Sequence, residues 1–170
     1  AFDRISSYLD FANQSDDCEV LCGGGYDKSN GYFVEPTIIL AKYPHFKTLE
    51  EEIFGPVLTI YVYENEKWNE TLELIDNTSP YALTGCVFSE NRDIVNEVRL
   101  KLRFAAGNFY VNDKPTGAVV GQQPFGGSRA SGTNDKGGSM LNLLRWTSPR
   151  TIKETFEPPQ NYKYPYMDEE

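Results

Sequence analysis

The sequence predicts an α/β fold in which a mostly parallel sheet carries helices on both faces. Strand patterns rich in β-branched and aromatic residues alternate with amphipathic helical patterns through the middle of the chain. The links between them are short, and such strand–helix–strand units are typical of parallel sheets with right-handed crossovers. A length of 170 residues suffices for one domain with its own core and is too short for two.

The N-terminal part is predicted to hold one helix and two strands. Apolar residues recur there at helical spacing, at Phe2, Ile5, Leu9 and Ala12. Residues 19–22 and 32–40 read as strands joined by a loop, which begins with three glycines at 23–25. A phosphate-binding loop is one interpretation of these glycines. Because no Lys-Ser or Lys-Thr pair and no helix pattern follow them, we favour a turn or a bulge.

The middle of the chain has the most regular pattern. It predicts, in order, a strand at 57–63, a helix at 67–76, a strand at 83–89, a helix at 92–103 and a strand at 107–112. Trp68, Leu72 and Ile75 share one face of the first of these helices. These five elements are the basis of the predicted parallel sheet.

The composition changes at 113–138, which is rich in glycine and poor in periodic apolar residues. A loop of this length inside a compact domain is usually functional. A short helix or turn at 141–146 and an extended segment at 147–153 follow, and a tail at 157–170 is expected to lie on the surface. We therefore divide the chain into a main part, 1–143, and a C-terminal segment with its tail, 144–170.

The charge balance argues against a nucleic-acid partner. The chain has 16 basic and 25 acidic residues, a net charge of −9, and an acidic surface repels phosphate backbones. The basic residues Arg99, Lys101 and Arg103 read as the solvated face of a helix. No stretch approaches the ~20 apolar residues that a membrane span needs.

The cysteines predict neither disulfides nor a metal site. Cys18, Cys22 and Cys86 form no framework spacing, which favours a reducing compartment and buried structural thiols. No paired cysteines or histidines complete a zinc site, and His45 stands alone. Because the chain begins at Ala1 within a helical pattern, we expect it to be a fragment or a processed piece.

Two segments could carry chemistry. At 50–57 three carboxylates meet a turn before an apolar strand. A carboxylate there could accept hydrogen bonds from sugar hydroxyls, but the residues alone favour solvated charges beside a core Phe54. At 117–128 small residues could let backbone amides form an anion-binding nest, with Phe125 walling an apolar slot. A purely structural loop is an equally good interpretation of that segment.

Both segments resemble motifs of the aldehyde dehydrogenase superfamily. Glu-Glu-Ile-Phe-Gly-Pro-Val at 51–57 resembles its cofactor-side motif, and Pro-Phe-Gly-Gly-Ser-Arg-Ala-Ser-Gly at 124–132 resembles its substrate-side segment. The runs at 107–114, 120–127 and 144–149 resemble the Δ1-pyrroline-5-carboxylate dehydrogenases of the animal mitochondrial type. The resemblance covers essentially the whole chain and identifies it with the C-terminal part of such an enzyme. It implies that 1–143 belongs to the catalytic domain and that 144–170 is an oligomerisation strand with its tail.

The resemblance implies roles for five residues. Glu52 hydrogen-bonds the nicotinamide ribose of NAD, and Phe54 packs against that end of the cofactor. Gly117 and Ala118 hold the α-carboxylate of glutamate γ-semialdehyde through backbone amides. Ala118 stands where some relatives carry serine, so one hydroxyl contact is missing. Phe125 packs along the aliphatic chain of the substrate.

The resemblance also implies what the chain lacks. In the family a cysteine thiolate attacks the aldehyde, hydride passes to NAD, and a glutamate-activated water hydrolyses the thioester. The nucleophile, the base and the NAD-binding domain precede the matched segment, so this chain holds no catalytic residue. The parent enzyme is expected in the mitochondrial matrix as a homodimer or larger homo-oligomer, paired through 144–154. The alternatives are a non-catalytic assembly module and another aldehyde dehydrogenase subfamily.

Overall fold

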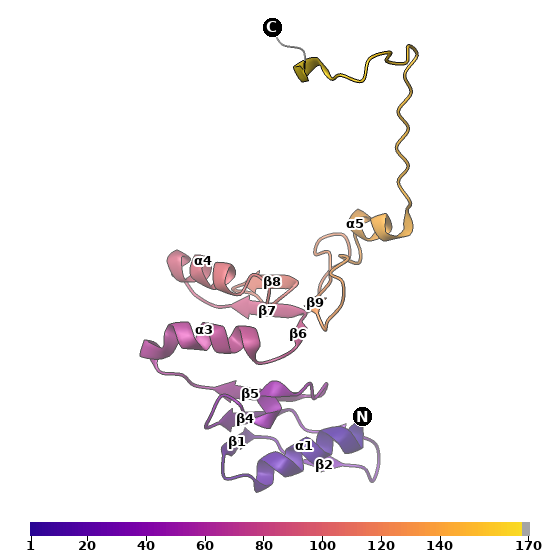
Figure 1. Ribbon diagram of the computed structural model, residues 1–170. Coiled ribbons are helices and arrows are strands. Elements are labelled where there is room, and N and C mark those ends of the chain that lie inside the picture. The colour runs from indigo at the N-terminus through magenta and orange to yellow at the C-terminus, as the bar shows by residue number, and fades with distance from the viewer. Residues whose placement is uncertain (168–170) are drawn as a thin grey trace.

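The computed structural model describes residues 1–167, and these form an α/β fold (Figure 1). Helix α1 and strands β1 to β5 lie at one end of the molecule, and α3, α4, β7 and β8 form a second group beside them. The C-terminal tail runs away from both groups. The α/β class predicted from the sequence is confirmed.

The first group is built around a three-stranded sheet in the order β1-β4-β5. Strand β1 (Cys18–Cys22) is antiparallel to β4 (Thr37–Ala41), and β4 is parallel to β5 (Val57–Tyr61). Helix α1 (Phe2–Gln14) buries Ile5, Ser6, Leu9 and Ala12, as its spacing predicts. Helix α2 (Lys47–Glu50) follows Phe46, which is fully buried with Ala12, Cys18, Ile39 and Ala41.

The predicted strand at 32–40 is interrupted. Only Phe33–Val34 (β3) and β4 are strands, and β3 pairs with β2 (Tyr26–Asp27) in a separate antiparallel pair. Pro36 lies at the break, where it has no N–H to give to a ladder. The triple glycine forms an irregular link between β1 and β2, in which Gly23 has a φ of 72°, and the register of β1 shifts just before it, between Val20 and Cys22. A bulge therefore lies beside the glycines, and β2 follows them where a phosphate-binding loop would need a helix.

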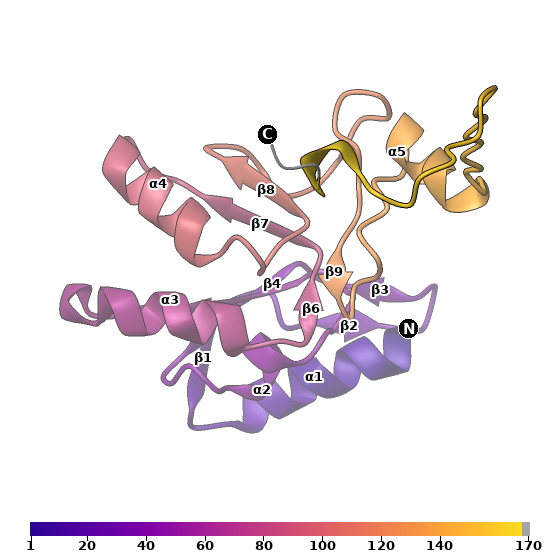
Figure 2. The ribbon, with the colours of Figure 1, turned by 45° about the horizontal axis from the view of Figure 1, so that its top comes forward.

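The second group consists of two helices and two parallel strands. Helices α3 (Trp68–Asn77) and α4 (Arg92–Lys101) pack against one another beside the parallel pair β7 (Thr84–Val87) and β8 (Asn108–Val111) (Figure 2). Leu72, Val98 and Leu102 form the core between them, and the Trp68 indole donates to the Glu97 carboxylate at 3.1 Å. A short 3₁₀ turn, η1 (Asn65–Lys67), precedes α3. All five elements predicted between 57 and 112, which include β5 of the first group, are present.

The prediction of one mostly parallel sheet is wrong for the described residues, because β5 and β7 do not pair. The strands form four separate sheets. A cleft of about 920 Å³ lies between the groups, with Tyr61, α3 and the whole of β7 in its walls. A helical crossover fixes the parallel direction of two strands but not their adjacency, and therefore β5 and β7 can belong to different sheets.

The glycine-rich region at 113–138 contains one short strand, β9 (Ser128–Arg129), which pairs with β6 (Tyr81–Ala82). Helix α5 (Met140–Leu143) runs directly into the 3₁₀ turn η2 (Leu144–Trp146), and a further 3₁₀ turn, η3 (Pro165–Met167), lies near the end. Residues 147–154 form no strand, contrary to the predicted oligomerisation strand. In the described part of the chain no neighbouring strand offers these residues ladder hydrogen bonds, which is the physical reason for the difference. The domain boundary at 143 and 144 stays a prediction.

Candidate functional site

The three carboxylates at 50–52 have different environments. Glu50 lies 2.7 Å from His45 Nδ1, and Glu51 accepts a hydrogen bond from the Tyr8 hydroxyl at 2.5 Å. That bond to Glu51 raises the pKa of Tyr8. Glu52 is exposed and lies in the wall of the cleft, and within residues 1–167 its carboxylate has no hydrogen bond or ion pair. Both oxygens of the Glu52 carboxylate are therefore free to accept hydrogen bonds from a ligand.

The turn after Glu52 exposes Phe54. The Arg4 guanidinium of α1 donates to the carbonyl oxygens of Glu52 at 3.3 Å and of Ile53 at 2.5 Å. Ile53 is buried, whereas the Phe54 side chain is 80% exposed with a φ of 54°. The interpretation that placed Phe54 in the core is wrong, because this left-handed turn points the ring outward. A bulky residue at positive φ is uncommon and strained, and such strain clusters at ligand sites.

Gly117 and Ala118 lie on the glycine-rich loop with unpaired amides. Gly117 has a φ of 73° and is exposed, and Ala118 is half-buried. In the described part of the chain neither amide N–H has a hydrogen-bond acceptor. The next turn is closed by the Gln123 side chain, whose Oε1 accepts from the Val119 amide at 2.9 Å. Two neighbouring free amides beside a closed turn can bind an anion.

Phe125 lies on the same loop and its backbone is fixed. Its amide donates to the Gly137 carbonyl at 2.9 Å, and its carbonyl accepts from the Gly137 amide at 2.7 Å. The Phe125 side chain is 38% exposed. The loop thus presents an apolar ring about seven residues after an anion-binding pair of amides. Among the described contacts, none joins this loop to Glu52 or Phe54.

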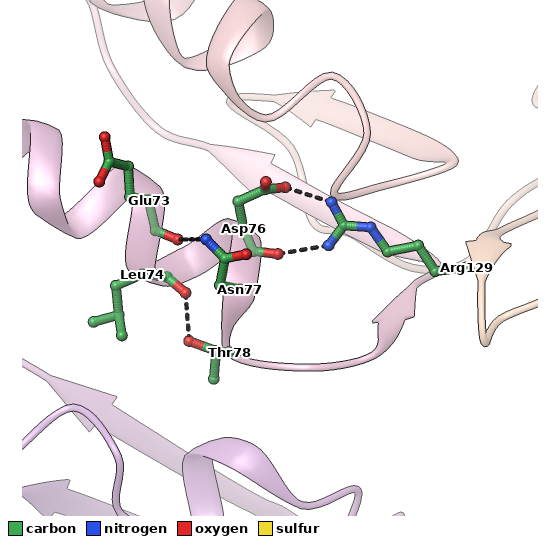
Figure 3. Close-up of polar contacts among 6 residues, drawn as sticks. All are labelled: Glu73, Leu74, Asp76, Asn77, Thr78 and Arg129. Atoms are coloured by element: carbon green, nitrogen blue, oxygen red, sulfur yellow. Dashed lines mark hydrogen bonds and ion pairs between the residues drawn. The ribbon is translucent and has the colours of Figure 1, made fainter.

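Sequence reasoning missed Arg129, which holds the loop to α3 (Figure 3). Its guanidinium donates to the Asp76 carbonyl at 2.5 Å and to the Asp76 carboxylate at 2.6 Å. The end of α3 is closed by Asn77, which donates to the Glu73 carbonyl at 2.7 Å, and by Thr78, which donates to the Leu74 carbonyl at 2.6 Å. The Ser-Arg-Ala-Ser-Gly run was visible, but no local signal paired Arg129 with Asp76, which is 53 positions away.

The cysteines differ from the prediction that all three are buried. Cys18 is buried and donates to the Ala12 carbonyl at 3.3 Å, and burial raises the pKa of its thiol. Cys86 is half-buried, whereas Cys22 is exposed at the end of β1, where the register shift turns it out of the core. Within residues 1–167 no three His, Cys, Asp or Glu residues gather in a way that could hold a metal ion. In the same range no helix has the length and apolar character needed to cross a bilayer.

A match between this sequence and the model of a protein family identifies its family. The model described as "Aldehyde dehydrogenase family" matches residues 1–152. This chain belongs to the aldehyde dehydrogenase family. The relatives of this chain can therefore inform the functions of the two exposed segments.

Several relatives of this aldehyde dehydrogenase chain carry one enzyme name. This chain is 65% identical over 167 residues to the mitochondrial Delta-1-pyrroline-5-carboxylate dehydrogenase of Dictyostelium discoideum. The match covers 98% of this chain and 30% of the relative. The Homo sapiens protein of that name is 55% identical over the same coverage. The chain thus spans about a third of the length of these relatives.

A solved structure agrees with the sequence comparison. The Delta-pyrroline-5-carboxylate dehydrogenase from Mycobacterium tuberculosis, described as bound with NAD, matches with a TM-score of 0.78 and 51% identity. The match covers 98% of this chain and 30% of that one. The fold of this chain is therefore that of a segment of an aldehyde dehydrogenase.

Proposed function

We propose that the chain is part of a longer, NAD-dependent enzyme that oxidises L-glutamate γ-semialdehyde to L-glutamate in proline breakdown. The observation that carries the proposal is the glycine-rich loop, on which the free amides of Gly117 and Ala118 are followed along the chain by the partly exposed ring of Phe125. That arrangement suits a substrate with a carboxylate at one end and a short aliphatic chain. The names of the relatives support the same substrate.

Within the proposed enzyme this chain binds the substrate and supplies no catalytic residue. Gly117 and Ala118 hold the α-carboxylate by their backbone amides, and Phe125 covers the aliphatic chain and excludes water from it. The nucleophilic cysteine, the general base and the NAD-binding domain come from the part of the enzyme that precedes this C-terminal segment. None of Cys18, Cys22 and Cys86 lies on the glycine-rich loop at 113–138.

Glu52 and Phe54 are proposed to contact NAD. Glu52 offers an exposed carboxylate without a partner in residues 1–167, which suits a ribose hydroxyl, and Phe54 offers an exposed ring to the nicotinamide end. NAD, when bound, supplies the acceptor for the hydride that leaves the substrate. The similarity to the Mycobacterium tuberculosis enzyme, whose structure is described as bound with NAD, supports this assignment.

The enzyme is proposed to act in the mitochondrial matrix as a homodimer or a larger homo-oligomer. The relatives named mitochondrial support the location. Exposed apolar side chains on and after η2 support pairing through 144–154, and they include Trp146 and Ile152.

The test compares the longer enzyme with the 170-residue chain in an assay of NADH formation from NAD and glutamate γ-semialdehyde. The longer enzyme is expected to form NADH, whereas the isolated chain is expected to match a blank. Turnover by the chain alone would refute the division of roles. Failure of the longer enzyme with this substrate, together with turnover of other aldehydes, would assign it to another subfamily.

A second candidate is a non-catalytic assembly module that binds an intact subunit through 144–154. The exposed apolar side chains of that segment favour it. The mass of the native polypeptide separates the two candidates. A native chain near 19.3 kDa supports the module, and one about three times larger supports the enzyme.

A further inference from the structure

The side chain of Asn108, at the start of β8, is bonded to the backbone on both sides of Phe125. Its Nδ2 donates to the Pro124 carbonyl at 3.1 Å, and its Oδ1 accepts from the Gly126 amide at 3.1 Å. A carbonyl can only accept and an amide N–H can only donate, so one orientation of the Asn108 amide satisfies both. Neither an aspartate nor a serine offers this pair of groups at that spacing.

The opposite side of the Phe125 backbone is bonded to Gly137, as described above. Pro124 to Gly126 therefore form a short extended segment held between the Asn108 side chain and Gly137. The segment also lies directly against β8, because a Cβ on Gly107 would come within 1.9 Å of the Gly126 carbonyl oxygen. The backbone that carries Phe125 is thus held on both sides by hydrogen bonds.

Lys136 connects the two sides of this arrangement. Its ammonium group donates to the Gly107 carbonyl at 2.5 Å and lies 3.5 Å from Asn108 Oδ1. Lys136 is half-buried, has a φ of 54° and directly precedes Gly137. Within residues 1–167 it forms no ion pair. Its cation is therefore used to hold backbone and amide oxygens in place.

We propose that Asn108 and Lys136 are positioning residues for substrate affinity. They touch no substrate, and they act by fixing the backbone that carries Phe125. This inference rests on the proposed function, because it takes Phe125 as the wall for the aliphatic chain of the substrate. Its consequence is that loss of either side chain weakens binding of glutamate γ-semialdehyde more than it slows the chemical step.

The test uses the longer enzyme and Asn108→Ala. The KM for glutamate γ-semialdehyde is expected to rise roughly 10-fold, because two hydrogen bonds that position the loop are lost, while kcat changes less than about 2-fold. The KM for propionaldehyde, which has no carboxylate and a shorter aliphatic chain for the Phe125 ring to cover, is expected to rise much less. Asn108→Asp keeps the acceptor for Gly126 but places a carboxylate oxygen against the Pro124 carbonyl oxygen, so it should also raise the KM for glutamate γ-semialdehyde.

Asn112→Ala is the matched control. Asn112 lies at the other end of β8 and also makes two bonds to backbone, accepting from the Ser89 amide at 2.8 Å and donating to the Ser89 carbonyl at 3.0 Å. Its loss should lower thermal stability as much as Asn108→Ala does and leave the KM for glutamate γ-semialdehyde unchanged. Lys136→Met keeps the aliphatic stem and tests the same idea if Asn108→Ala does not fold.

The outcomes separate the inference from the proposed function. If the unsubstituted enzyme shows no turnover of glutamate γ-semialdehyde, the proposed function fails and takes the inference with it. If that enzyme is active and neither Asn108→Ala nor Lys136→Met shifts the KM beyond the control, the positioning role is wrong. An equal rise in KM for propionaldehyde would also overturn it, because a general structural defect is not selective for one substrate.

Discussion

Replacement of Gly117 by alanine tests the carboxylate site directly. Gly117 has a φ of 73°, and the nearest atom to an added Cβ is the Lys114 Cε at 3.7 Å, so the new methyl group meets no steric obstacle. The effect is conformational, because an L-residue in this region costs about 1–2 kcal/mol. We expect the backbone to leave this conformation and the amide to turn away from the carboxylate.

The size of the effect follows from the bond that is lost. A hydrogen bond to a charged group contributes about 1.5–3 kcal/mol, which corresponds to a rise in KM of about 10- to 100-fold for glutamate γ-semialdehyde. Gly121→Ala is the control, because Gly121 also has a positive φ, 81°, and no atom within 4 Å of its added Cβ. It imposes similar strain on the same loop and should leave the KM unchanged.

The assay is steady-state NADH formation by the longer enzyme, with propionaldehyde as a comparison substrate that has no carboxylate. Gly117→Ala should raise the KM for glutamate γ-semialdehyde alone. An equal loss with both aldehydes, or an equal effect of Gly121→Ala, would refute the assignment of the carboxylate to this pair of amides.

Three further predictions concern other parts of the molecule. Phe46→Ala should lower the free energy of unfolding by about 3–5 kcal/mol in denaturant titrations, because Phe46 is fully buried, and a loss below about 1 kcal/mol would contradict the described core. Cys22 should react with a thiol reagent at neutral pH well before Cys18, whose raised pKa leaves it protonated until higher pH, and faster labelling of Cys18 would be inconsistent with its burial. Arg129→Lys should increase protease cleavage of the glycine-rich loop, since one ammonium group cannot replace both guanidinium bonds to Asp76. The Arg129 and Asp76 side chains are 31% and 34% exposed, so we expect a stability loss of only about 1–2 kcal/mol. Unchanged cleavage would refute this role of Arg129.

Local patterns predicted the helices and strands but not how the strands are grouped. The apolar residues that indicate α1 and α4 lie close together in the sequence, and so do the β-branched residues that indicate β5. These elements could therefore be located from the sequence. The separation of β5 from β7 depends on which strand lies next to which, and periodicity holds no information on that. The interruption at Pro36 could have been predicted from its missing N–H.

The site shows the same division. The motifs located Glu52 and the loop that carries Gly117, Ala118 and Phe125, and the resemblance supplied their roles. The exposure of Phe54 depends on a positive φ, which residue type does not favour there. The bonds of Asn108 and Arg129 join positions 16 to 53 residues apart, and no spacing rule connects such positions.

The glycine-rich loop is proposed to hold the carboxylate of the substrate, and a crystal structure of the longer enzyme with glutamate, the proposed product, would show whether it does. We expect the α-carboxylate within hydrogen-bond distance of the Gly117 and Ala118 amides, with the Phe125 ring along the aliphatic chain. Glutamate bound with its α-carboxylate on other residues, and with these two amides facing solvent, would show that the loop does not recognise the substrate.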